Sequence, residues 1–164
     1  MNEYLQMIPS PNRERCAQLW WDNEERFQHA RGSSHNHQAW PGGYVDHVTD
    51  VMRIACALYP SLQTIRTVPF VLADALLVLF LHDLEKPWRE VYHFATKLEK
   101  RRFRATKIAE YGIELTPAQE NALRYVEGEG DEYRPDARVM NELAAFCHMC
   151  DVASARIWHS VRGG

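Results

Sequence analysis

The chain contains no apolar run long enough to cross a bilayer and no excess of positive charge. Its longest apolar stretch, Val68 to Leu81, includes Asp74 and is too short to span the hydrocarbon core of a membrane. The formal net charge is −3, so the chain lacks a general attraction to nucleic acid or to an anionic membrane surface. The first residues, Met1 to Tyr4, also lack the basic start of a signal peptide. We therefore expect no membrane and no long nucleic acid as a partner.

Cysteine is scarce, and its placement excludes a disulfide scaffold. The chain has four cysteines, at Cys16, Cys56, Cys147 and Cys150. Cys147 and Cys150 stand three residues apart in a helical pattern with no second pair, which is typical of packed thiols rather than of a zinc finger. The pattern predicts a soluble protein of a reducing compartment, the cytoplasm. The length of 164 residues predicts one domain spanning residues 1–164.

Apolar residues recur at steps of three and four along most of the chain, which predicts an all-α fold. The expected architecture is a compact bundle of about six helices, over about residues 10–30, 44–58, 69–86, 89–111, 116–126 and 135–161. The third of these is apolar on nearly every face and is therefore expected in the centre of the domain. Thr116 with Gln119 predicts a capping box, with Pro117 at the first helical position.

Two histidines and two aspartates in the predicted helices suggest a metal site. His82 and Asp83 end the most apolar helix, His47 begins the helix after Gly42-Gly43, and Asp151 lies inside the last helix. Imidazole nitrogens and carboxylate oxygens together suit a divalent ion. Neighbouring helical residues point about 100° apart, so His82 and Asp83 can share an ion only in a corner between helices. We call His47, His82, Asp83 and Asp151 the tetrad.

Each member of the tetrad also has a simpler interpretation. A single helical histidine such as His47 is more often a hydrogen-bonded core residue than a metal ligand. A buried pairing with Arg156 would account for Asp151 without a metal, since an unpaired buried charge is costly. The residue types allow Mn, Co, Fe, Ni, Zn or Mg, and we expect one divalent ion, with a second left open.

The order of the tetrad resembles that of the HD-domain phosphohydrolases, whose pattern is His, then His-Asp, then Asp, on a compact helical bundle. The segment Gly42 to His47 resembles the glycine-led first helix of that family. The segment Leu81 to Lys86 resembles its hydrophobic-His-Asp-hydrophobic-x-Lys signature. The resemblance spans about residues 35–158 and implies a metal-dependent hydrolase of phosphoesters, in which the tetrad holds the ion.

The resemblance also bears on the catalytic groups. Some nucleotidase-type members carry a catalytic Glu three residues after the Asp, whereas this chain has Lys86 there, with Glu85 beside it. We therefore take Lys86 and Glu85 as catalytic candidates, and add Glu129 from the acidic loop Glu127 to Asp131 as a general acid or base.

Several other residues are candidates for substrate binding. Lys97 and Arg101 stand one turn apart on a basic helix and are expected to bind phosphate, although an ordinary solvated helix face would look the same. Arg156 is a further phosphate or carboxylate partner. The polar loop before the first ligand adds nucleobase-binding candidates, or else forms a polar lid: His35, His37 and Trp40.

Short stand-alone chains of this kind resemble bacterial deoxynucleotidases and phage dATP triphosphohydrolases. The resemblance implies a cytoplasmic enzyme of a bacterium or a phage-infected cell, a homo-oligomer that hydrolyses a small nucleotide, best a dNTP of the dATP type. The alternatives are a 5′-deoxynucleotidase on monophosphates, a 3′–5′ exoribonuclease or cyclic-nucleotide phosphodiesterase, and a non-catalytic nucleotide-binding module.

Overall fold

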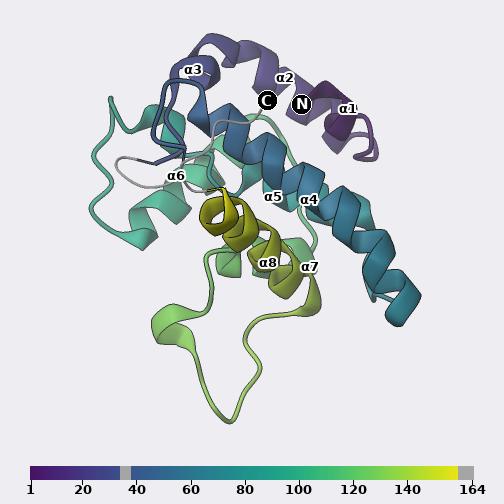
Figure 1. The fold of residues 1–164 in the computed structure, drawn as a ribbon. Helices are drawn as coiled ribbons and strands as arrows, with labels where there is room; N and C mark the ends of the chain where they lie inside the picture. Colours follow the sequence, from purple (N-terminus) through teal and green to yellow (C-terminus); the bar gives the residue numbers. More distant parts are fainter. Residues whose placement is uncertain (34–37, 159–164) are drawn as a thin grey trace.

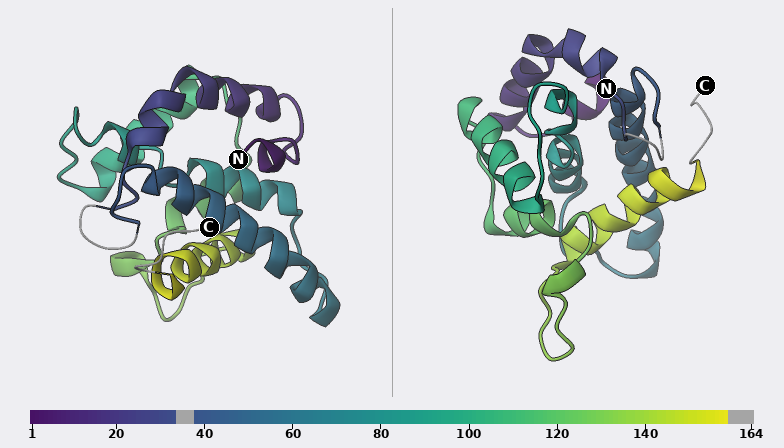
Figure 2. Two further views of the ribbon diagram at one scale, coloured as in Figure 1. Left: turned by 45° about the horizontal axis from the view of Figure 1, so that its top comes forward. Right: turned by 90° about the vertical axis from the view of Figure 1, so that its left-hand side faces the viewer.

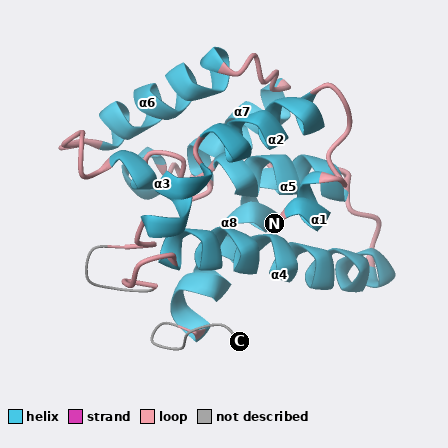
Figure 3. Ribbon diagram, turned by 90° about the horizontal axis from the view of Figure 1, so that it is seen from above, coloured by secondary structure: helices cyan, strands magenta, loops and turns pink. Residues whose placement is uncertain are grey.

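The structure is a computed structural model that describes residues 1–33 and 38–158. These residues form eight α-helices and two short 3-10 helices, joined by loops, and no strand occurs among them (Figure 3). The elements in chain order are α1 (Asn2–Leu5), α2 (Asn12–Asp22), α3 (Glu24–His29), α4 (Gly43–Ile65), α5 (Leu72–Leu81), η1 (Lys86–Trp88), α6 (Lys97–Glu110), α7 (Pro117–Tyr125), η2 (Gly130–Glu132) and α8 (Glu142–Ile157). The predicted all-α class is confirmed.

Helix α5 forms the centre of the domain, as its sequence predicts. Every residue from Ala75 to Leu81 is buried, and the helix contacts α4, α7 and α8. Helix α8 lies alongside α4 and α7, while α2 and α3 cover another side of the bundle (Figure 1). A helix without a polar face can be stabilised only when other helices surround it. Because α5 ends between its neighbours, the residues that follow it emerge inside the bundle.

The helix count exceeds the expected six for two reasons. The four-residue helix α1 was not predicted, and the expected helix over residues 10–30 divides into α2 and α3 at Asn23. The side chain of Asn23 donates hydrogen bonds to the carbonyl oxygen of Leu19, at 2.9 Å, and to the hydroxyl of Tyr111, at 3.0 Å. An Asn side chain that binds nearby backbone competes with the helical hydrogen bonds, which explains the break.

Several predicted helix boundaries were wrong. The helix expected to end near Leu58 continues to Ile65, and the one expected over residues 69–86 spans only Leu72–Leu81. The basic helix begins at Lys97 rather than at Arg89, because Thr96 and Glu99 form a capping box that fixes its first turn. The last helix begins at Glu142 rather than at Pro135, where the side chain of Asn141 accepts a hydrogen bond from the backbone N–H of Ala144. The capping box of Thr116 and Gln119 is confirmed.

The chain between α7 and α8, residues 126–141, extends away from the bundle, as two further views show (Figure 2). It carries η2 at its start and otherwise lacks regular structure apart from a single bridge between Arg134 and Ala137. Among the described residues, none of the helices combines the length and the apolar character needed to cross a membrane.

Candidate metal centre

The fold brings the four members of the tetrad together from three helices. His47 lies in the first turns of α4, His82 is the C-cap of α5, and Asp151 lies in α8. The Nε2 atoms of His47 and His82 are 3.2 Å apart. His47 Nε2 also lies 3.3 Å from Asp83 Oδ2 and 3.1 Å from Asp151 Oδ1. The helix corner that the sequence requires for His82 and Asp83 is therefore present.

The two imidazole rings are held by their other nitrogen atoms. His82 Nδ1 is 2.7 Å from the carbonyl oxygen of Leu79, and His47 Nδ1 is 3.1 Å from the hydroxyl of Ser154. A carbonyl oxygen can only accept a hydrogen bond, so Nδ1 of His82 must carry a proton. This contact fixes the ring and leaves Nε2 facing the other members of the tetrad, which is how metal-binding histidines are commonly oriented.

Asp83 lies at the middle of the tetrad. Its Oδ2 atom is buried, lies 3.2 Å from His82 Nε2 and 3.3 Å from His47 Nε2, and contacts the ammonium group of Lys86. Imidazole nitrogens and a carboxylate oxygen at this spacing are a ligand set that suits a divalent ion. The ligand atoms of His47, His82 and Asp83 all lie within 4.8 Å of one another, so these three residues could hold a metal ion. Asp151 is the fourth ligand candidate through its contacts with both imidazoles.

The histidines and carboxylates of the tetrad shift one another's pKa values. Burial lowers the pKa of His82, but Asp83 and a hydrogen bond with Asp151 outweigh it and raise that pKa to about 10. Burial would raise the pKa of Asp83, yet the charges of Lys86 and His82 hold it well below its usual range. Asp151 behaves likewise, since hydrogen bonds with His47 and His82 lower its pKa. A protonated His82 therefore balances the negative charge of Asp83 and Asp151, as a divalent ion would when bound.

The three predicted catalytic residues have different surroundings. The ammonium group of Lys86 contacts Asp83 Oδ2, which places it at the centre. Glu85 is fully buried beside Asp83, and burial followed by the charge of Asp83 raises its pKa. Glu129 instead accepts a hydrogen bond from the backbone N–H of Met140, at 3.3 Å, and so contributes to the shape of its own loop. The acidic-loop residue that approaches the centre is Glu127.

The predicted phosphate-binding residues of α6 do not join the tetrad. Arg101 forms an ion pair with Glu132, at 3.0 Å, and donates to the carbonyl oxygen of Arg124. Lys97 is exposed and lies near Gly130. Both residues therefore connect α6 with the segment that follows α7. Arg156 is exposed in the last turn of α8.

The polar loop before α4 is described only in part. The indole N–H of Trp40 donates a hydrogen bond to Asp46 in the first turn of α4, at 2.7 Å. This bond ties Trp40 to the helix that carries His47. His35 and His37 lie outside the described residues.

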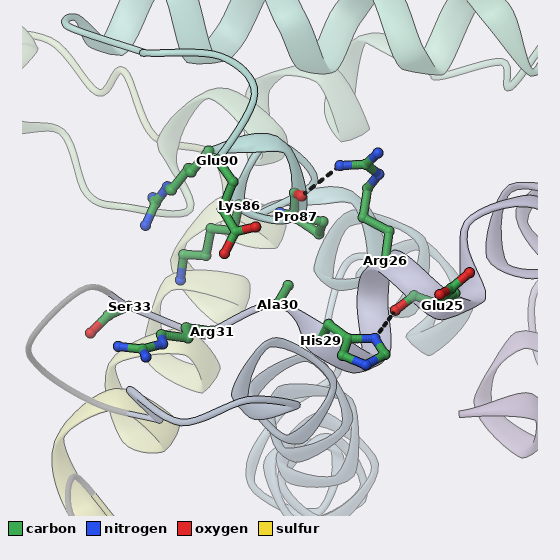
Figure 4. Close-up of a pocket in the computed structure, with 10 residues that line it drawn as sticks. Glu25, Arg26, His29, Ala30, Arg31, Ser33, Lys86, Pro87 and Glu90 are labelled. Atoms are coloured by element: carbon green, nitrogen blue, oxygen red, sulfur yellow. Dashed lines mark hydrogen bonds between the residues drawn. The ribbon is translucent and has the colours of Figure 1, made fainter.

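A cleft of about 680 Å³ adjoins the tetrad through Lys86, which lines it (Figure 4). Figure 4 shows Lys86, Arg31 and Ser33 gathered on one side of the cleft and Glu25 on the other. Four of the lining residues are cationic and two are acidic. The cationic ones are Arg26, Arg31, Lys86 and Arg89, and the acidic ones are Glu25 and Glu90. Lys86 lines this cleft and contacts Asp83 directly, whereas Lys97 and Arg101 of α6 pack toward the segment that follows α7.

Three functional neighbours of the tetrad were not predicted from the sequence. Ser154 orients His47 and stands three residues after Asp151, a spacing that places both on one face of α8 and was a usable sign. Gln38 donates a hydrogen bond to Ser154, at 3.2 Å, from a part of the chain that no periodicity covers. Arg104 of α6 is buried and donates to the carbonyl oxygen of His82, although its position among basic residues predicted a solvated side chain.

Comparisons with known proteins identify no relative. No protein-family model matches the chain, and searches of curated proteins and of solved structures found no significant match. Inferences about function therefore rest on the residues and their geometry.

Proposed function

We propose that the chain is a metal-dependent phosphohydrolase of the HD type that cleaves a phosphoester of a small deoxynucleotide, with a dNTP as the first substrate to test. The observation that supports this most strongly is the convergence of two histidine Nε2 atoms on the carboxylates of Asp83 and Asp151. Each ring is held through its other nitrogen atom, an arrangement that is typical of metal-binding histidines.

The tetrad would hold a divalent ion through two neutral imidazoles and two carboxylates. When bound, such an ion supplies Lewis-acid polarisation of a phosphoryl oxygen and lowers the pKa of water. The chain itself keeps both rings in place, through Leu79 for His82 and through Ser154 for His47. Asp151 is only partly buried, with 18% of its side chain exposed, so the centre is open to solvent on the α8 side.

The cationic cleft supports a phosphorylated substrate. Lys86 reaches from the cleft to Asp83, so its ammonium group lies between the metal centre and the space where a phosphate would bind. Arg26 is held in the cleft wall by a hydrogen bond to the carbonyl oxygen of Pro87, at 3.4 Å, and by its position 5.4 Å above the ring of Trp88. Arg31 is exposed on the opposite wall. Cations fixed in this way offset the charge that phosphoryl transfer concentrates on oxygen.

A substrate panel tests the proposal. Metal-stripped protein would be supplied with each divalent ion in turn and incubated with dATP, dAMP, cyclic AMP and an RNA oligomer, with phosphate, pyrophosphate and triphosphate measured separately. We expect hydrolysis of a free deoxynucleotide, and the released product shows which bond breaks. Cleavage of the oligomer alone would favour an exoribonuclease, and binding without turnover would favour a non-catalytic module.

Asp83→Ala provides the matched test of the site. We expect it to abolish hydrolysis while circular dichroism still shows a helical fold, because Asp83 follows α5 and its removal takes no apolar side chain out of the core. Asp136→Ala, at an exposed residue outside the helices, serves as the control and is expected to keep full activity. Full activity of metal-free Asp83→Ala protein would eliminate the proposal.

A further inference from the structure

Beside the tetrad, three carboxylates converge on a second point. Oxygen atoms of Asp83, Glu85 and Glu127 lie within 4.8 Å of one another. Asp83 belongs to the tetrad as well, whereas Glu85 and Glu127 contribute nothing to the first group. The three come from two separate stretches of the chain, the segment after α5 and the segment after α7. Like charges this close need positive charge nearby, part of which Lys86, Arg89 and Arg104 supply.

Glu85 has unused capacity to bind a cation. Its side chain is fully buried, and neither carboxylate oxygen makes a hydrogen bond. Arg89 and Arg104 lie 3.5 Å and 3.9 Å from its oxygens, close enough to offset charge but without forming hydrogen bonds to them. The guanidinium group of Arg104 donates instead to the carbonyl oxygen of His82. Both oxygens of Glu85 therefore retain hydrogen-bonding capacity that a cation could use. Burying them without hydrogen bonds lowers the stability of the folded protein.

Glu127 is placed opposite Glu85 by a turn that α8 supports. His148 Nδ1 lies 2.7 Å from the carbonyl oxygen of Val126, the residue before Glu127. The residue after it, Gly128, has a φ of 92°, and a Cβ there would lie 3.3 Å from the His148 ring. The backbone on both sides of Glu127 is therefore fixed by packing, while its side chain is exposed and lets an ion enter from solvent.

We propose that Asp83, Glu85 and Glu127 form a second cation site, which takes a hard divalent ion such as Mg²⁺ or Mn²⁺ and shares Asp83 with the tetrad. Oxygen-only ligands select this class of ion, in contrast to the two imidazoles of the tetrad. Adjacent oxygens around Mg²⁺ stand about 3 Å apart and opposite oxygens about 4.2 Å apart, so the exposed Glu127 side chain would have to rotate toward Asp83 and Glu85 when an ion binds. The site itself stands on these contacts, and its use in catalysis rests on the proposed hydrolase function.

Metal counting by equilibrium dialysis against Mn²⁺ tests the proposal. We expect the unchanged protein to bind two Mn²⁺ ions per chain, and Glu127→Gln to bind one. Glu129→Gln is the matched control, because Glu129 lies in the same loop but hydrogen-bonds Met140, and it should still bind two ions. Electron paramagnetic resonance should show the coupled signal of a pair of neighbouring Mn²⁺ ions, which Glu127→Gln would lose. Glu127 is at the surface, so its variant is expected to fold.

The outcomes separate this inference from the proposed function. One Mn²⁺ ion per chain at saturation, with nucleotide hydrolysis intact, would overturn the second site and leave the hydrolase proposal standing. Two coupled ions without hydrolysis of any nucleotide would support the second site and count against the hydrolase. Two ions in Glu127→Gln would also overturn the site as assigned, because Glu127 would then not be a ligand.

Discussion

The Nδ1 atom of His47 lies 3.1 Å from the hydroxyl oxygen of Ser154, which follows Asp151 by three residues on α8. One face of α8 therefore carries both a member of the tetrad and the group that orients another member. The same hydroxyl accepts a hydrogen bond from the side-chain amide of Gln38, at 3.2 Å. An oxygen can accept two hydrogen bonds, so Ser154 can receive the N–H of His47 and that of Gln38 together.

Ser154→Ala is expected to weaken divalent-metal binding by about 10- to 100-fold, because the orienting partner of a metal-binding histidine fixes both the tautomer and the direction of the ring. Titration against a chromophoric chelator measures the affinity directly, without any assumption about the substrate. Ser61→Ala, at an exposed serine of α4, is the control and should leave the affinity unchanged. An unchanged affinity in folded Ser154→Ala protein would show that the hydroxyl has no orienting role.

The metal-free protein is expected to lose stability as the pH rises from about 6.5 toward 10. The pKa of His82 is raised to about 10 in the folded state, against about 6.5 for an unfolded histidine. The folded state therefore binds a proton that the unfolded state releases in this range, and the stabilisation that is complete below pH 6.5 disappears as the pH approaches 10. Urea unfolding in the presence of a chelator measures the free energy of unfolding at each pH.

Asp151→Asn provides the comparison for that pH series. It removes a carboxylate that raises the pKa of His82 while leaving Asp83 in place, so the loss of stability with rising pH should become smaller. Stability of the unchanged metal-free protein that stays level or increases between pH 6.5 and 10 would contradict the assignment of a protonated His82.

The sequence could predict the centre of the fold and the tetrad because both depend on local pattern. Helix α5 is apolar apart from Asp74, which favours a central position, and a His-Asp pair at the end of a central helix meets other ligands between helices. The break at Asn23 was not predicted, and one of the two hydrogen bonds of its side chain joins it to Tyr111, a residue 88 positions away. Long-range partners of this kind leave no trace in periodicity.

The choice of residues around the tetrad shows the same limit. Glu127 and Glu129 share one acidic loop, and only the turn at Gly128, packed against His148, decides which of them faces Asp83. Arg101 and Arg104 share one basic helix, yet Arg101 pairs with Glu132 while Arg104 is buried against His82. Composition identified these neighbourhoods, but the packing between helices selected the individual side chains.

Arg31→Ala is expected to raise the KM for a nucleoside triphosphate about 5-fold with a smaller change in kcat, because an exposed cation contributes up to about 1 kcal/mol to binding an anion. Arg31 lines the cleft on the same side as Lys86 but makes no contact with the tetrad, so it would bind a phosphate without touching the metal centre (Figure 4). The effect should shrink as ionic strength increases. Arg102→Ala, at an exposed arginine of α6, is the control, and an equal increase in KM for both variants would argue against binding in the cleft.

Gly43→Ala is expected to weaken metal binding although a side chain at position 43 would meet Gln38 rather than a member of the tetrad. A Cβ at Gly43 would lie 1.9 Å from the backbone carbonyl oxygen of Gln38, so one of the two segments must move. Displacement of Gln38 removes its hydrogen bond to Ser154, and the strain should cost about 1–3 kcal/mol of folding free energy. Gly42→Ala separates strain from position: its φ of 83° costs about 1–2 kcal/mol for alanine, but its Cβ would meet only Gln28, at 3.4 Å. Urea unfolding should therefore show that both variants are destabilised. Chelator titration should show weaker metal binding in Gly43→Ala alone. Equal metal affinities of the two variants would mean that the position of Gln38 does not influence His47.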